Sequence, residues 1–188
     1  MFAAACEGFR RVPTEDFRKD VAEHVRDGVL YVIIKDSKAV GFAVFKDYPE
    51  LKTTYISGIV KGSGTPSGIV EKIVARHVSN FETAVVRTQN DRVVEIMKGV
   101  CREVIPIRRE ADEKDLDILK QTKLFSPKMS SDLVVHGHYS GSPMIGEGER
   151  RRSQDEEVRK TTDRLDYEKG DALILIGFIG CYNNEVTT

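Results

Sequence analysis

Apolar residues in the first half of the chain recur at helical spacing in some segments and form short β-branched runs in others. Phe17, Val21 and Val25 are four residues apart, which predicts a helix over residues 14–26 with one apolar face. Similar patterns later in the chain predict two further helices and five strands. The helices are expected at residues 67–78 and 91–100, and the strands at residues 29–34, 40–48, 53–60, 81–88 and 102–107.

The order of these elements indicates the fold class. The polar turn KDSKA is short enough to join the first two strands in an antiparallel hairpin, and a crossover unit follows later in the chain. We therefore predict an α/β (α+β) fold, in which helices flank a mixed, mostly antiparallel sheet.

The character of the chain changes after Arg109. We therefore assign residues 1–110 to a core domain and residues 111–188 to a C-terminal extension. Within the extension, the pattern predicts a helix over residues 113–125 and a strand over residues 133–139.

The rest of the extension is first charged and then apolar. Charged residues of both signs dominate the segment 140–171, above all from residue 147 onward, which predicts either an exposed helix or a disordered segment. Only Val158, Leu165 and Tyr167 could be buried there. The apolar segment 172–182 predicts a buried strand. Because a buried strand needs a sheet to join, we expect it to return to the main sheet.

Composition and charge limit the function classes. Apolar residues make up 40% and charged residues 31% of the chain, which is typical of a globular domain. The formal net charge of −1 favours neither nucleic acid nor a membrane surface as a partner, and no apolar run is long enough to span a bilayer. Cys6, Cys101 and Cys181 are odd in number and far apart, which argues against a disulfide framework and favours a cytoplasmic location.

The stretch SGIVKGSGTPSGIVEKIV, residues 57–74, leads from a predicted strand through four glycines into a predicted helix. The first amides of a helix, its dipole and glycines that permit close approach together make an anion site, so the junction predicts a phosphate or pyrophosphate cradle. An ordinary flexible connection is the alternative. Neither the P-loop signature nor the dinucleotide fingerprint is satisfied, because Ile69 and Val70 follow Gly68 and the glycine spacing is one residue too long.

Five residues of this junction follow a fixed spacing: Val60, Thr65, Gly68, Val70 and Ile73. After the next strand, Asn90 opens a helix that ends at a glycine-hydrophobic pair. This pattern resembles the run V-x-P-x-x-[QR]-x-x-G-x-[GA]-x-x-[LI] and the following asparagine of the GNAT superfamily of acyl-CoA-dependent N-acetyltransferases. The resemblance covers residues 12–108.

The resemblance implies that acetyl-CoA is the co-substrate and that a small-molecule or protein amine is the acceptor. A pair of splayed strands would hold the pantetheine arm through the backbone of Ile59 and Val60, and Asn90 would touch it. The amides of the loop would hold the pyrophosphate. The implied loop residues are Thr65, Pro66, Ser67, Gly68, Ile69 and Val70.

Two residues near the third predicted strand are candidates for proton transfer. Glu50 is a candidate general base, with Glu103 as a further carboxylate, and Tyr55 is a candidate proton donor. The alternatives are solvated carboxylates and a tyrosine that packs on a sheet face. No metal site is expected, because His136 and His138 have no nearby cysteines or spaced carboxylates to complete a ligand set. His24 and His77 are expected to pack near the core.

Three residues depart from the family pattern. Thr65 replaces glutamine or arginine, Val70 replaces glycine or alanine, and Met97 stands near the position of a tyrosine acid. The valine is expected to crowd the pyrophosphate, and methionine cannot donate a proton. These departures support a second hypothesis, a non-catalytic module of the same fold. Such a module would serve a homo-oligomer or another protein assembly through residues 111–188.

Overall fold

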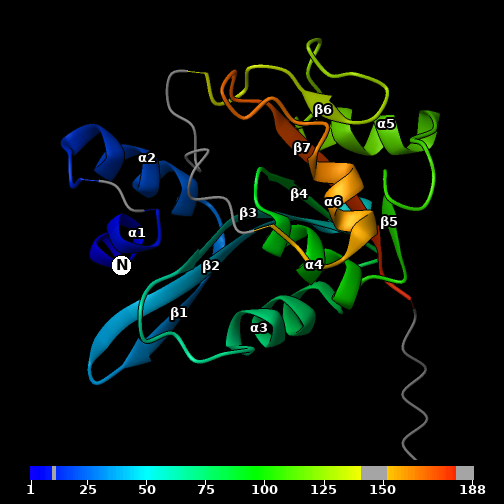
Figure 1. Cartoon of the computed structure of the whole chain (residues 1–188). Helices are drawn as coiled ribbons and strands as arrows, with labels where there is room; N and C mark the ends of the chain where they lie inside the picture. Colours follow the sequence, from blue (N-terminus) through cyan, green and yellow to red (C-terminus); the bar gives the residue numbers. More distant parts are fainter. Residues whose placement is uncertain (10–11, 141–151, 181–188) are drawn as a thin grey trace, which may run out of the picture.

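The computed structural model describes residues 1–9, 12–140 and 152–180 of the 188-residue chain. A seven-stranded sheet runs through the molecule, with helices on both faces (Figure 1). In chain order the elements are α1 (Phe2–Gly8), α2 (Glu15–Val25), β1 (Val29–Lys35), β2 (Lys38–Tyr48), the 3-10 turn η1 (Pro49–Leu51), β3 (Thr53–Lys61), α3 (Ile69–Val78), β4 (Thr83–Thr88), α4 (Asp91–Val100), β5 (Glu103–Ile105), α5 (Glu113–Gln121), β6 (Val134–Val135), α6 (Glu156–Thr162) and β7 (Ala172–Phe178).

The strand order in the sheet is β1-β2-β3-β4-β7-β5, and β6 pairs with the start of β7. Only β3 and β4 are parallel, and all other strand pairs are antiparallel. The predicted fold class is therefore confirmed, as are the hairpin of β1 and β2 and the predicted helix after residue 14. The Thr14 hydroxyl accepts a hydrogen bond from the amide of Phe17 at 3.2 Å and so caps α2.

The two faces of the sheet are packed differently. On the face covered by α3, α4 and α6, here the α3/α4 face, one continuous apolar cluster includes Phe45, Ile56 and Val86. On the opposite face, here the α2/α5 face, the apolar residues form two separate clusters. One packs α1 and α2 against β2 and β3 around Phe17, and the other packs α5 against β4, β5 and β7 around Leu119. The α3/α4 face therefore holds the larger core.

The segment 172–182 was expected to return to the main sheet, and β7 does so. It lies between β4 and β5 and pairs with both, and Leu173 and Leu175 are fully buried on the α3/α4 face. The near-continuous apolar sequence follows from this position, because a central strand is covered on both faces.

Two expectations about the extension need correction. The strand expected at 133–139 is limited to Val134–Val135, because Leu133 and Gly137 have positive φ angles of 61° and 64° that end extended structure on both sides. The helix expected at 113–125 ends at Gln121.

The charged segment is neither disordered nor an exposed helix where the structure describes it. Val158 and Thr162 of α6 are fully buried, and Asp155 caps the helix by accepting from the amides of Glu157 and Val158. Residues 141–151 lie outside the described residues. The sequence predicted that only a few residues here could be buried, and Val158 was among them.

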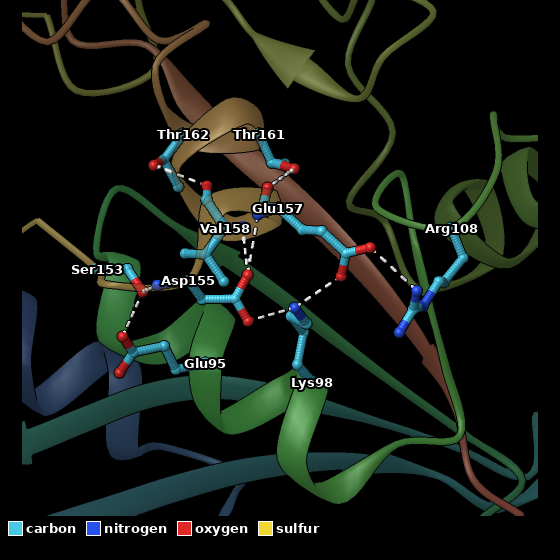
Figure 2. Close-up of polar contacts among 9 residues, drawn as sticks. All are labelled: Glu95, Lys98, Arg108, Ser153, Asp155, Glu157, Val158, Thr161 and Thr162. Carbon is cyan, nitrogen blue, oxygen red and sulfur yellow. Dashed lines mark hydrogen bonds and ion pairs between the residues drawn. The ribbon is translucent and has the colours of Figure 1, made fainter.

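Charged side chains hold α6 against α4 (Figure 2). Lys98 of α4 donates to the carboxylates of Asp155 and Glu157, and Arg108 donates to Glu157 at 3.0 Å. The Ser153 hydroxyl donates to Glu95 of α4. We call this set of contacts the α4–α6 tether. It fixes part of the extension to the core.

Candidate active site

The parallel strands β3 and β4 separate partway along their length. They pair from Thr53 with Thr83 to Ile56 with Val86, and then β3 continues to Lys61 without β4 beside it. A β-bulge lies at the same point, because Phe45 and Val44 of β2 pair with Ile56 and Gly58 and leave Ser57 as an extra residue. A bulge bends its strand, which explains why β3 turns away from β4 here.

Beyond this point, no strand in the described part of the chain pairs with the outer edge of β3. Ile59 and Val60 pair with Ala43 and Phe42 of β2, and the opposite edge of these residues faces the opening. Their side chains lie on different faces, with Val60 buried beside α2 and Ile59 half-buried beside α3. The backbone at Ile59 and Val60 is thus placed where an extended ligand could add to the strand, as the resemblance implies.

The amides in the first part of the glycine loop already donate hydrogen bonds within the protein. The amide of Gly62 donates to the Val40 carbonyl at 2.9 Å, and that of Ser63 donates to Glu7 of α1 at 2.9 Å. The Thr65 amide donates to Gly62 at 3.2 Å, and its buried hydroxyl donates to Val40 at 2.6 Å. Both donors of Thr65 are therefore engaged inside the loop, and this half of the loop offers little to an anion.

The second part of the loop is open. Gly64 and Gly68 have φ angles of 82° and 75°, and a Cβ added at either would meet no atom within 4 Å. Within the described residues no hydrogen bond involves the amides of Ser67 or Gly68, and Gly68 is the N-cap of α3. Pro66 and Ser67 are exposed. The open amides at the start of α3 are the part of the predicted cradle that remains available to a phosphate.

Val70 does not obstruct this end of α3. It was expected to crowd the pyrophosphate, but its side chain is 3% exposed and packs into the core on the α3/α4 face. The expected crowding is therefore wrong, because the helix turns the side chain at this position inward. Ile69 is half-buried, and its amide makes only a long 3.5 Å contact with the Pro66 carbonyl.

A carboxylate lies close to the open amides. Glu71, in the first turn of α3, accepts a hydrogen bond from its own amide and forms an ion pair with Arg92 of α4. Burial opposes its ionisation, but these bonds and the charges of Arg92 and Lys61 outweigh burial, so the pKa of Glu71 is lowered. Glu71 thus places negative charge beside the site implied for a pyrophosphate.

Asn90 and Met97 lie on α4. Asn90 is exposed and caps the helix, because its side-chain oxygen accepts from the amide of Arg92 at 2.9 Å. The cap at the start of this helix is confirmed, and within the described residues no hydrogen bond involves the side-chain nitrogen of Asn90. Met97 is fully buried, so no proton donor stands at the position implied for the family tyrosine.

The two candidates for proton transfer lie in different environments. Tyr55 lies on β3 opposite Val85, next to the point where the strands separate, and faces the α2/α5 side. Burial raises its pKa, although the charge of Arg87 opposes the shift, so Tyr55 is protonated at neutral pH. Glu50 is exposed in η1, directly before β3, and no hydrogen bond among the described residues joins it to Tyr55.

The histidines fall into different environments. His77 is buried as expected, with Nε2 2.9 Å from Asp47 and Nδ1 3.2 Å from the Tyr31 hydroxyl. His24 is exposed, so its predicted packing near the core is wrong. The Nδ1 atom of His136 is 3.0 Å from Asp171. Among the described residues no three histidines, cysteines or carboxylates gather in a way that could hold a metal ion.

Sequence reasoning missed Arg87, which lies on β4 one residue past the last pair with β3. Its Nε atom is buried and has no hydrogen-bond partner. A charged residue inside the apolar run FETAVVRT was the available signal. Arg87 adds a cation to the same side of the sheet as Tyr55.

Comparisons with known proteins bear on the fold. No protein-family model matches the chain, and no curated protein matches its sequence. An acetyltransferase of Bacillus subtilis, solved in complex with CoA, is 11% identical with a TM-score of 0.50, and the match covers 88% of this chain and 86% of that one. A GNAT family acetyltransferase of Elizabethkingia anophelis with acetyl-CoA bound is 12% identical with a TM-score of 0.47, over 88% and 85% of the two chains. The likeness to the Bacillus subtilis structure confirms the architecture implied by the resemblance: the chain has the same fold as this acetyltransferase.

No helix among the described residues is long and apolar enough to cross a membrane.

Proposed function

We propose that the protein is an N-acyltransferase that moves an acetyl group from acetyl-CoA to an amine. The separation of β3 and β4 at the bulge of Ser57, directly before the open amides of α3, is the observation that carries this proposal. It provides an unpaired strand edge and an anion site in sequence, as a long ligand with a diphosphate at one end requires. The proteins of the same fold named above were solved with CoA or acetyl-CoA.

Each part of acetyl-CoA would be held by a different group of residues. The amides of Ser67, Gly68, Ile69 and Val70 would hold the pyrophosphate, and the backbone of Ile59 and Val60 would pair with the pantetheine arm. Asn90 would donate to the arm through its side-chain nitrogen. Thr65 and Pro66 would shape the loop, because the donors of Thr65 are engaged and proline has no amide hydrogen.

Acetyl-CoA supplies an activated acetyl thioester when it is bound. Tyr55, held protonated by burial, would donate a proton to the departing sulfur. Glu50 is exposed in η1 and no hydrogen bond among the described residues joins it to Tyr55. The acceptor would therefore lose its proton to water, or enter as the neutral amine.

Calorimetry with CoA tests the binding part of this proposal. We expect micromolar affinity for the wild-type chain and a loss of at least tenfold for Ser67→Glu, because a carboxylate there repels the pyrophosphate. Ser67 is preferred over Gly68, whose positive φ would strain any side chain. Gly99→Glu is the matched control, because Gly99 is exposed on α4 with no atom near its Cβ position. Equal affinity in both variants would contradict the assigned loop.

Tyr55→Phe tests the chemical part. We expect kcat for acetyl transfer to fall by about 10²-fold, the usual contribution of a positioned acid, while CoA affinity stays unchanged. In the wild type kcat should fall at high pH as Tyr55 ionises, since ionised tyrosine cannot donate, and this fall should be absent in Tyr55→Phe. An unchanged kcat would remove Tyr55 from the mechanism and leave the CoA site intact.

A non-catalytic module of the same fold is the second candidate. The engaged donors of Thr65, the carboxylate of Glu71 and the buried Met97 favour it, and the tether of α6 to α4 shows that residues 111–188 contribute to the packing of the core. No heat with millimolar CoA would support this candidate. A cytoplasmic location suits either function, since Cys6 and Cys101 are free thiols and burial raises the pKa of Cys101 to about 12.

A further inference from the structure

Arg87 is a half-buried charged residue in the interior of the sheet. Its neighbours Val86 and Thr88 are 4% and 5% exposed, and Arg87 itself pairs in register with Ile174 of β7. Side chains alternate along β4, so Arg87 lies on the α2/α5 face together with Val85. Tyr55, which pairs with Val85, lies on the same face. Arg87 therefore stands between the two apolar clusters of that face, at the point where β3 and β4 separate.

The guanidinium of Arg87 has no partner in the described part of the chain. Its Nε atom is buried without a hydrogen bond, and no described carboxylate forms an ion pair with it. Two other arginines near the sheet are paired, Arg92 with Glu71 and Arg109 with Asp115. Because leaving a buried donor unsatisfied is costly, an acceptor from outside the chain is the simplest completion of this site.

The two titratable groups on which the charge of Arg87 acts, Tyr55 and His138, do not neutralise it. Burial raises the pKa of Tyr55 and lowers that of His138 to about 4, and the charge of Arg87 acts on both groups. At neutral pH Tyr55 and His138 are therefore both uncharged. The charge of Arg87 is available to an anion that reaches this face of the sheet.

We propose that Arg87 binds a carboxylate of the acceptor, so that the acceptor is a small molecule with both an amine and a carboxylate, as in an amino acid. This inference rests on the acetyl transfer proposed above. A guanidinium matches a carboxylate with two parallel hydrogen bonds, which lysine cannot do. A carboxylate held there leaves the amine a few bonds away, beside Tyr55 and the opening through which the acetyl group would arrive.

A binding experiment tests the carboxylate site without any transfer reaction. The Nε–H resonance of Arg87 in the ¹⁵N-labelled full chain is followed during titration with amino acids and with the amines obtained by removing their carboxylate. We expect the resonance to shift with at least one amino acid and with none of the decarboxylated amines. No shift with any amino acid at millimolar concentration overturns the proposal, as does a shift with phosphoethanolamine alone.

Kinetics with matched variants give the second test. Arg87→Gln should lower kcat/KM for an accepted amino acid at least 100-fold, mainly through KM, while Arg87→Lys retains part of it. For a carboxylate-free amine the wild type and Arg87→Gln should be equal. Arg76→Gln is the control, because Arg76 is exposed on α3 and its loss removes the same charge.

The outcomes separate the two proposals. If CoA binds and transfer occurs but Arg87→Gln changes kcat/KM less than threefold, the carboxylate site is wrong and the transferase stands. If CoA does not bind while amino acids still shift the Arg87 resonance, the transferase is wrong and the carboxylate site stands.

Discussion

The two faces of the sheet show how one set of strands can serve stability and binding at once. On the α3/α4 face the buried residues form a single cluster that extends from β1 to β7. On the α2/α5 face the apolar residues form two separate clusters, and Tyr55, Ser57 and Arg87 lie between them. The strands are the same, so the difference comes from the alternating side chains alone.

The central strand β4 illustrates this division. Ala84 and Val86 point into the continuous cluster, while Val85 and then Arg87 point to the other face. A substitution on β4 should therefore affect either stability or binding, depending on whether its position is even or odd.

Truncation of one phenylalanine on each face gives the strongest comparison. Phe45 is fully buried in the continuous cluster and stacks on His77, with the ring centroids 3.9 Å apart. Phe45→Ala should therefore lower the free energy of unfolding by about 4 kcal/mol. Phe17 lies in the smaller cluster under α1 and α2, and Phe17→Ala should cost about 2 kcal/mol, because this cluster can relax more easily. Urea unfolding measures both values. Equal losses would contradict the division of the faces.

Two glycines test how tightly the continuous cluster is packed. A Cβ at Gly177 of β7 would lie 2.3 Å from the Cys101 sulfur, so Gly177→Ala should destabilise the fold by about 2 kcal/mol. Gly99 of α4 has no atom within 4 Å of its Cβ position, so Gly99→Ala should stabilise it by about 0.5–1 kcal/mol through helix propensity. Thermal melts of both variants give the sign. A neutral Gly177→Ala would show that Cys101 and its surroundings can move.

The α4–α6 tether extends the α3/α4 face outward. Lys98→Met should cost about 1 kcal/mol, because it leaves Asp155 and Glu157 without their shared cation. The hydrogen bond from Lys98 lowers the pKa of Asp155, so this stabilisation is present above the unfolded value near pH 4 and is lost as pH falls through the folded value. Lys72→Met is the control, since Lys72 is exposed on α3. An equal loss in both variants would show that the tether is energetically neutral.

The smallest effect is expected at the glycine loop. Glu71→Gln should tighten CoA binding about threefold to fivefold, because it removes a negative charge beside the amides of Ser67 and Gly68. Glu23→Gln, on exposed surface of α2, should leave the affinity unchanged. Calorimetry compares the two variants. Weaker binding in Glu71→Gln would indicate that Glu71 positions Arg92 for the ligand.

Much of the architecture could be predicted because its signals are local. Periodic apolar residues indicated α2, α3 and α4, and β-branched runs indicated the strands from β1 to β4. The cap at Asn90 and the glycines of the loop follow from local backbone chemistry, and the structure shows both. These features depend on residues only a few positions apart.

The site was harder to predict because it depends on distant contacts. The engagement of Ser63 with Glu7 joins residues 56 positions apart, and the separation of β3 from β4 follows from a bulge that no motif indicates. The burial of α6 depends on α4, so the charged sequence around Val158 gave the wrong impression of exposure. Arg87 becomes noticeable only once its lack of a partner is known.

The place of β7 between β4 and β5 has a consequence for biosynthesis. Both neighbours leave the ribosome long before residues 172–178, so during translation their inner edges have no partner. Unpaired edges invite association with other nascent chains, and the sheet can close only when this late segment inserts. Closure of the sheet should therefore wait for the synthesis of residues 172–178 and be sensitive to chaperones that shield strand edges.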